Sequence, residues 1–181
     1  MNITAMYFSG TGTTKKVTAA IADELTEIKI SQDETAADEN PGSIKADIKP
    51  WQRAEDIDFT PPAARREIYR FTPDDLVVFG VPVIAGRVPN VLLKFLDTLQ
   101  GGGALAVPVV LYGNRNFDDA LIELRNILQD RGFYAIGAAA FIGEHSFSRI
   151  LAAGRPDSSD MELSRDFARK LAGKIRRLGA A

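Results

Sequence analysis

The most informative absence in this sequence of 181 residues is cysteine, which does not occur at all. Without cysteine the chain can form no disulfide, has no thiolate nucleophile and cannot hold an iron–sulfur cluster through its own thiolates. Histidine occurs once, so a zinc site would have to combine that residue with carboxylates. We therefore predict no metal site, and any redox chemistry requires an organic cofactor.

An excess of charge of either sign is also missing. The 22 basic and 24 acidic residues give a formal net charge of −2, so no strong field attracts nucleic acid or a membrane surface. No apolar run approaches the roughly 18 residues that span a bilayer, and MNITAMYF at the N-terminus has no basic leader. We expect a cytoplasmic protein that binds neither nucleic acid nor membrane.

The residues that are present have the composition of a globular domain. Hydrophobic residues make up 45% of the chain and charged residues 25%, and the length fits one domain over residues 1–181. Residues 29–54 are polar, contain the breaker Asn40-Pro41-Gly42 and have no sustained periodicity. We predict an insertion there, either a surface excursion or a small hairpin.

Short apolar runs alternate with amphipathic segments along the rest of the chain. The patterns predict strands at residues 2–8, 56–60, 76–83, 107–113 and 133–143, with residues 27–31 as an alternative second strand. They predict helices at residues 15–28, 63–71, 90–99 and 117–131, and a last helix that begins with a capping box of Ser159 and Glu162. Because the interior strands are almost continuously apolar, we predict an open, doubly wound α/β domain with a five-stranded parallel sheet between two helical layers.

In such a sheet, ligands bind outside the carboxyl ends of the strands. The segment that leaves the first strand reads Ser9-Gly10-Thr11-Gly12-Thr13-Thr14. Its glycines let a ligand approach the backbone, and its hydroxyls and the free N–H groups of the following helix can bind phosphate oxygens. An ordinary tight turn with a threonine cap is the alternative.

The spacing of this first loop restricts which phosphate it can bind. It does not match G-x-x-x-x-G-K-[ST], and it fails G-x-G-x-x-G because Lys15 occupies the place of the third glycine. Neither a P-loop nor a dinucleotide-binding loop is therefore favoured.

Three more loops leave predicted strand ends and carry candidate ligand-binding residues. The candidates are Pro82, Val83, Ile84, Ala85, Gly86 and Arg87, then Gly113, Asn114, Arg115, Asn116, Phe117 and Asp118, and finally His145. Prolines and glycines stiffen a loop and let its backbone lie close to a planar ring. Each polar candidate also has a plain structural explanation: Asn116 can cap the next helix, Arg87 can be a surface residue, and His145 can be structural.

The first loop matches the pattern [ST]-x-T-G-x-T and in this it resembles the phosphate loop of the flavodoxins. The segments GRVPN and GEHSF are similar to those of a flavodoxin branch found alone or fused to ferredoxin-type cluster domains, although this chain has no cysteine for such a cluster. The resemblance implies the strand order 2-1-3-4-5 with FMN at the switch point, for which flavodoxin is itself the standard example. It also implies that residues 9–14 hold the phosphate and that residues 82–87 and 113–118 flank the ring. Ile84 stands where a stacking aromatic is expected, so Tyr112 or Phe117 becomes the candidate for that contact.

The function implied by the resemblance is that of an FMN-binding electron-transfer protein. Its partners would be redox proteins or small electron donors and acceptors, and it would be a monomer or a homodimer. Two alternatives stay open: an FMN-dependent NAD(P)H:quinone or flavin reductase, and a flavin-free binding module with the same fold. No catalytic residue is assigned.

Overall fold

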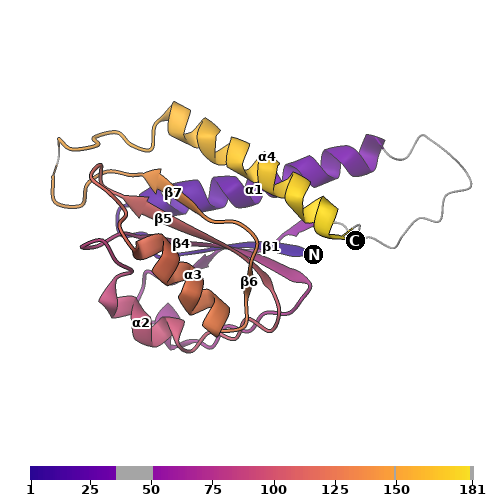
Figure 1. The fold of residues 1–181 in the computed structure, drawn as a ribbon, viewed down its shortest axis with the longest axis horizontal. Helices are drawn as coiled ribbons and strands as arrows, with labels where there is room; N and C mark the ends of the chain where they lie inside the picture. The colour runs from indigo at the N-terminus through magenta and orange to yellow at the C-terminus, as the bar shows by residue number, and fades with distance from the viewer. Residues whose placement is uncertain (36–50, 149, 180–181) are drawn as a thin grey trace, which may run out of the picture.

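The computed structural model describes residues 1–35, 51–148 and 150–179. In this part of the chain, seven strands form one sheet in which every pairing is parallel (Figure 1). The strands are β1 (Asn2–Tyr7), β2 (Gln52–Arg53), β3 (Ile57–Asp58), β4 (Asp75–Pro82), β5 (Leu105–Tyr112), β6 (Tyr134–Ala135) and β7 (Ala139–Ile142). The helices are α1 (Thr13–Thr35), the short 3₁₀ helix η2 (Ala64–Arg66), α2 (Asn90–Leu96), α3 (Ala120–Asp130) and α4 (Ser158–Gly179).

The strand order is β2-β1-β4-β5-β6, with β3 also paired to β1 and β7 also paired to β5. The short strands β2 and β3 are thus two pieces of one edge strand, and β6 and β7 are two pieces of the other. Counted in this way, the sheet has five strands in the order 2-1-3-4-5. The predicted doubly wound α/β fold is confirmed.

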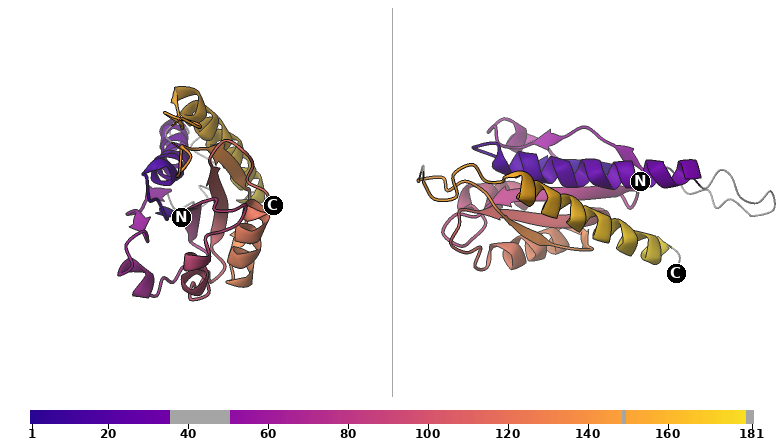
Figure 2. Two further views of the ribbon diagram at one scale, coloured as in Figure 1. Left: turned by 90° about the vertical axis from the view of Figure 1, so that its left-hand side faces the viewer. Right: turned by 90° about the horizontal axis from the view of Figure 1, so that it is seen from above.

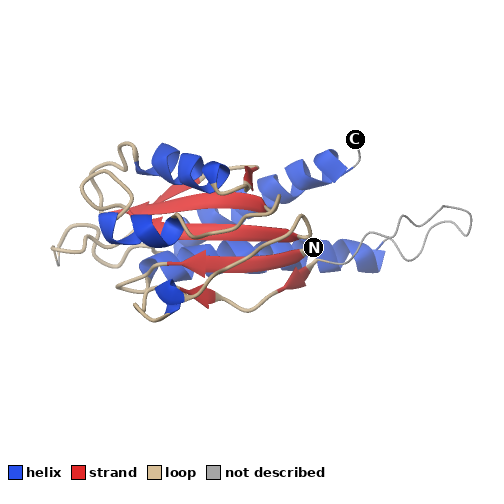
Figure 3. Cartoon of the chain, turned by 90° about the horizontal axis from the view of Figure 1, so that it is seen from below, coloured by secondary structure: helices blue, strands red, loops and turns tan. Residues whose placement is uncertain are grey.

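Helices cover both faces of the sheet, which gives three layers (Figure 2). Helices α1 and α4 lie on one face, and α2 and α3 lie on the other, which faces the viewer in Figure 3. Each face has its own cluster of buried apolar side chains, one against α1 and α4 and one against α2 and α3. Strands β4 and β5 are therefore buried on both sides, as their continuous apolar runs predict.

Close packing of α1 against β4 positions the first loop. A Cβ atom at Gly80 would lie 2.9 Å from Cγ2 of Thr14 and would also overlap the side chain of Thr18. Only glycine at this position allows the first turns of α1 to lie directly on the strand. This contact holds the start of α1 against the centre of the sheet. It therefore also fixes the end of the loop at residues 9–14.

The alternative second strand at residues 27–31 and the predicted end of the first helix are both wrong. Residues 27–31 belong to α1, so they are not the second strand, and the helix extends seven residues beyond its predicted end at residue 28. Residues 29–35 of the predicted insertion therefore continue this helix, residues 36–50 lie outside the described part, and Trp51 is buried in the core beside β2.

The segment at residues 63–71 is not a regular helix. Only η2 is helical there, and the N–H of Phe71 donates to the carbonyl oxygen of Gln100 instead (2.9 Å). Tyr69 and Phe71, two residues apart, both pack against the core beneath α2 and α3. This spacing suits an extended segment better than a helix.

The remaining differences are shifts of element boundaries. The strand expected at residues 133–143 is interrupted near Gly137, where a Cβ atom would lie 2.6 Å from Leu171 of α4. The capping box of helix α4 lies two residues earlier than expected and uses Asp157 and Asp160 rather than Ser159 and Glu162. The N–H of Asp160 donates to Oδ1 of Asp157 (3.0 Å), and the N–H of Asp157 donates to Oδ2 of Asp160 (2.9 Å).

Candidate functional site

The loop at residues 9–14, called here the first loop, joins the carboxyl end of β1 to α1. Its shape is set by Ser9, whose Oγ accepts a hydrogen bond from the N–H of Lys15 (3.0 Å). The N–H of Ser9 donates to Oγ1 of Thr60 (2.8 Å), in the segment after β3. These two bonds curl the loop around an open centre and tie it to the edge of the sheet.

The backbone N–H groups of the rest of this loop have no hydrogen-bond acceptor among the described residues; they belong to Gly10, Thr11, Gly12, Thr13 and Thr14. A Cβ atom at Gly10 or Gly12 would meet nothing within 4 Å, and Gly12 has a φ of +86° that favours glycine. The hydroxyl oxygens of Thr11 and Thr13 lie 3.2 Å apart. Free donors at the positive end of a helix, around a space that a side chain could fill, fit a phosphate group.

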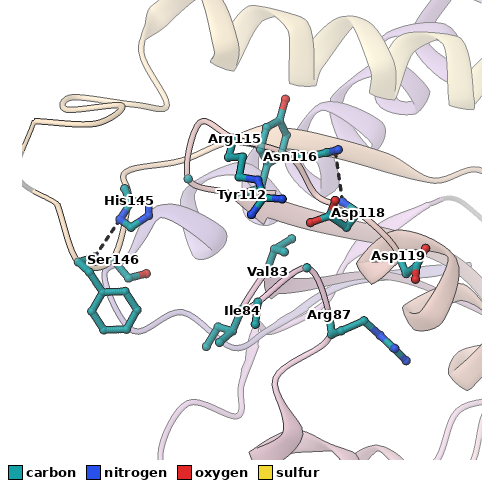
Figure 4. A pocket seen from close by; sticks show the side chains of 14 residues that line it. Val83, Ile84, Arg87, Tyr112, Arg115, Asn116, Asp118, Asp119, His145 and Ser146 are labelled. Carbon is teal, nitrogen blue, oxygen red and sulfur yellow. Dashed lines mark hydrogen bonds between the residues drawn. The ribbon is translucent and has the colours of Figure 1, made fainter.

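Three cavities adjoin one another at the carboxyl ends of the strands. The inner cavity (about 270 Å³) lies between the first loop and residues 82–84, and it is also lined by Leu111 and Gly143. The outer cavity (about 600 Å³) lies between residues 83–87 and 112–119 (Figure 4). The side cavity (about 430 Å³) lies between Thr11 and residues 144–148. Ser146 lines all three, so the cavities are neighbours, and we refer to them together as the cleft.

Residues 84–87 form a tight turn on one wall of the outer cavity. The N–H of Ile84 donates to the carbonyl of Arg87 (3.0 Å), and the N–H of Arg87 donates back to Ile84 (3.1 Å). Ala85 and Gly86 both have positive φ, 52° and 75°, which makes this a type I′ turn. Pro82 and Val83 precede the turn and line the inner cavity. The side chain of Ile84 is exposed at the junction of the inner and outer cavities.

The turn is fastened to α3 by an ion pair. The guanidinium of Arg87 donates two hydrogen bonds to the carboxylate of Glu123 (2.9 and 2.7 Å), which also accepts the N–H of Val88 (2.8 Å). The Arg87 guanidinium therefore lowers the pKa of Glu123. In Figure 4 the Arg87 side chain extends away from the other residues of the cavity, so its charge is directed toward Glu123.

The opposite wall is the loop that follows β5. Asn114 and Asp118 have positive φ values, 73° and 43°, which are uncommon outside glycine and often occur at ligand sites. Asn116 Oδ1 accepts the N–H groups of Phe117 (2.8 Å) and Asp118 (3.2 Å). Because α3 begins only at Ala120, Asn116 caps the turn before the helix and not the helix itself.

The two walls contact each other behind the cavity. The N–H of Asp119 donates to the carbonyl of Gly86 (3.1 Å), and a Cβ atom at Gly86 would lie 2.6 Å from Oδ2 of Asp118. The turn and the loop thus support each other through direct contacts, which reduces the ordering cost of binding.

The two aromatic candidates, Tyr112 at the end of β5 and Phe117 in the following loop, do not present the face of a ring to the outer cavity. Tyr112 borders the cavity, but its hydroxyl end points away from the other lining residues in Figure 4. Phe117 packs against the core and against Tyr112, with 5.6 Å between ring centroids. The aromatic residue that does line the outer and side cavities with an exposed ring is Phe147.

His145, the remaining candidate, lies beside Phe147 and lines both of these cavities. Sequence reasoning did not select Phe147, Ser146 or Glu144, although all three lie in the segment GEHSF that follows a predicted strand end. The signal that could have identified Phe147 is an aromatic residue that closely follows a predicted interior strand. Among the described residues, no cluster of three acidic or histidine side chains could hold a metal ion, and no helix is long and apolar enough to cross a membrane.

This chain is a doubly wound α/β protein whose inner cavity lies at the topological switch point of its sheet, between the ends of β1 and β4. Comparison with solved structures identifies the fold as flavodoxin-like. A flavodoxin from the domain Archaea matches with a TM-score of 0.62 at 15% identity, over 97% of this chain and 99% of that one. A Streptococcus pneumoniae TIGR4 flavodoxin matches with a TM-score of 0.58 at 16% identity, over 96% and 99%.

An NADH:FMN oxidoreductase in its apo form is also similar, with a TM-score of 0.56 at 15% identity over 94% of this chain and 88% of that one. No protein-family model matches the sequence, and a search of curated proteins finds no match either. At these identities the likeness establishes the fold.

Proposed function

We propose that this protein binds FMN without a covalent bond and carries electrons between redox partners. The observation that supports this most is the first loop, whose five free N–H groups and two glycines surround a space at the start of α1. This arrangement fits a dianionic phosphate, and the chain is similar in fold to flavodoxins. Bound FMN supplies one-electron and two-electron chemistry that no side chain of this cysteine-free protein supplies.

The first loop and two of the neighbouring cavities suit the three parts of this ligand in order. In the proposal, the first loop holds the phosphate, the inner cavity holds the chain that joins phosphate to ring, and the outer cavity holds the ring. The turn at residues 84–87 and the loop at residues 113–118 exclude water from its two sides. The redox partner is a protein or a small donor or acceptor, and the protein acts as a monomer or a homodimer.

One observation favours a reductase as the second candidate. The outer cavity is about 600 Å³ and is walled on one side by Ile84 rather than by an aromatic ring, which leaves room for a second planar molecule. One structural neighbour is an NADH:FMN oxidoreductase. Anaerobic mixing of the FMN-loaded protein with NADH and NADPH distinguishes the two: rapid bleaching of the flavin absorbance would contradict a pure carrier.

The test of flavin binding compares FMN with riboflavin, which lacks the phosphate. We expect the wild-type protein to bind FMN more tightly, and the double variant Thr11→Ala with Thr13→Ala to weaken FMN at least tenfold, about the effect of one hydrogen bond to a charged group. Riboflavin binding should not change. Thr14 is avoided because its side chain is buried against β4.

Thr98→Ala, an exposed threonine at the end of α2, is the matched control and should leave both affinities unchanged. A wild-type protein that binds neither flavin would contradict the proposal and favour a flavin-free binding module.

A further inference from the structure

Phe147 is almost fully exposed, with 91% of its surface accessible. It lies in the segment 144–148, shortly after β7, and it lines the outer cavity together with Ile84. An aromatic ring at the rim of a ligand-sized cleft is a favourable contact for a planar ligand, because the two rings remove apolar surface from water together.

The backbone on both sides of Phe147 is held in place by His145. The N–H of Phe147 donates to Nδ1 of His145 (3.1 Å), and the N–H of Ser148 donates to the carbonyl of His145 (3.3 Å). The N–H of His145 itself donates to the carbonyl of Leu151 (3.3 Å). Phe147 is thus exposed at its ring but anchored at its backbone.

The hydrogen bond from Phe147 also decides which nitrogen of His145 is a donor. A neutral imidazole has one acceptor and one donor, and Nδ1 is the acceptor here, so the hydrogen lies on Nε2. No described residue accepts a hydrogen bond from Nε2, and His145 lines the outer and side cavities. A free donor therefore adjoins the same cleft as the exposed ring.

We propose that Phe147 and His145 together form the third wall of the ring site, with Phe147 packing on the flavin ring and His145 Nε2–H donating a hydrogen bond to it. This inference rests on the proposed function. It assigns the aromatic contact to the segment after β7, because the turn after β4 has Ile84 and because Phe117 packs against the core and does not line the outer cavity. A hydrogen-bond donor stabilises the electron-rich reduced ring more than the oxidised ring, so His145 raises the flavin midpoint potential.

The first experiment measures the dissociation constants of FMN and riboflavin for Phe147→Ala. Because the contact is with the ring that both ligands share, we expect both affinities to fall by the same factor, roughly tenfold. Phe147→Tyr should retain most of the affinity. The matched control is Ile150→Ala: Ile150 is 87% exposed and lies three residues away, but it lines none of the three cavities.

The second experiment separates the two roles of His145. An asparagine amide can place its oxygen near the position of Nδ1, whereas the longer glutamine can place its N–H₂ near the position of Nε2. We expect His145→Asn to lower the midpoint potential, because the lost donor weakens the binding of reduced FMN more than that of oxidised FMN. His145→Gln should keep the potential closer to the wild-type value.

The outcomes separate the failure of this inference from the failure of the proposed function. If the wild-type protein binds no flavin, the proposed function itself is contradicted. If the wild type binds FMN while Phe147→Ala changes neither affinity, or only that of FMN, the ring contact is overturned. An unchanged potential in both His145 variants overturns the role of Nε2.

Discussion

Gly113 lies so close to His145 that a Cβ atom at Gly113 would be 2.9 Å from both Cα and Cδ2 of the histidine. The contact joins the loop after β5 to the segment after β7, two parts of the cleft that are about 30 residues apart in the sequence. The contact leaves no room for a side chain at Gly113, because Cα of His145 is a backbone atom and cannot turn away as a flexible side chain could. The position of His145 thus depends on the absence of a side chain at Gly113.

Replacing Gly113 with alanine should displace the segment after β7. We expect Gly113→Ala to lower the free energy of unfolding by about 1–3 kcal/mol, the usual effect of overpacking a close contact. The affinities for FMN and riboflavin should fall together, because the ring site loses a wall. Urea denaturation and flavin titration measure the two effects, and a variant as stable as the wild type would show that the segment moves without strain.

Replacing Gly10 with alanine should affect ligand binding but not stability, in contrast to the replacement of Gly113. A Cβ atom at Gly10 meets nothing within 4 Å, so we expect the free energy of unfolding of the ligand-free protein to change by less than about 1 kcal/mol. The added methyl group occupies the space proposed for the phosphate, so FMN should bind at least tenfold more weakly while riboflavin is unaffected. Calorimetric titration with both ligands measures this difference. Undiminished FMN binding would place the phosphate elsewhere.

The anchor of the turn at residues 84–87 can be removed through Glu123. Glu123→Ala leaves Arg87 and the N–H of Val88 without their acceptor, so the turn should become looser and bind FMN and riboflavin several-fold more weakly. Arg87→Lys, which cannot form two parallel bonds, should give a smaller loss in the same direction. Glu162→Ala on α4 also breaks an ion pair but one away from the cleft, and it should leave both affinities unchanged.

The buried carboxylate of Asp160 should make stability depend on acid pH. Hydrogen bonds from Arg155 lower the pKa of Asp160 below its ordinary value of 3.8. Its contribution is therefore fully present above that value and is lost as the pH falls through the lower pKa of the folded state. We expect Asp160→Asn to cost about 1–2 kcal/mol near pH 7, with the difference from wild type narrowing below about pH 4. Urea denaturation across pH 3–7 measures this, and a difference independent of pH would contradict it.

The elements with a clear periodic pattern could be predicted from the sequence. The interior residues of β4 and β5 form continuous apolar runs because both faces of these strands are buried there. The chain order of strands and helices then restricts the fold to a doubly wound sheet. The weak patterns failed where packing competed with local preference. Residues 27–31 suit a strand or a helix by composition, and the helix formed as a continuation of α1.

For the candidate site, the sequence by itself determined which loops leave the carboxyl ends of the strands, because parallel strands bring those ends to one edge. Only the tertiary structure decided how side chains on different loops meet. Arg87 forms an ion pair with Glu123, 36 residues further along the chain, and His145 packs directly against Gly113. Phe147 lines the cleft because His145 Nδ1 holds its backbone. Such contacts depend on distances between segments remote in the chain, which no local pattern of residues records.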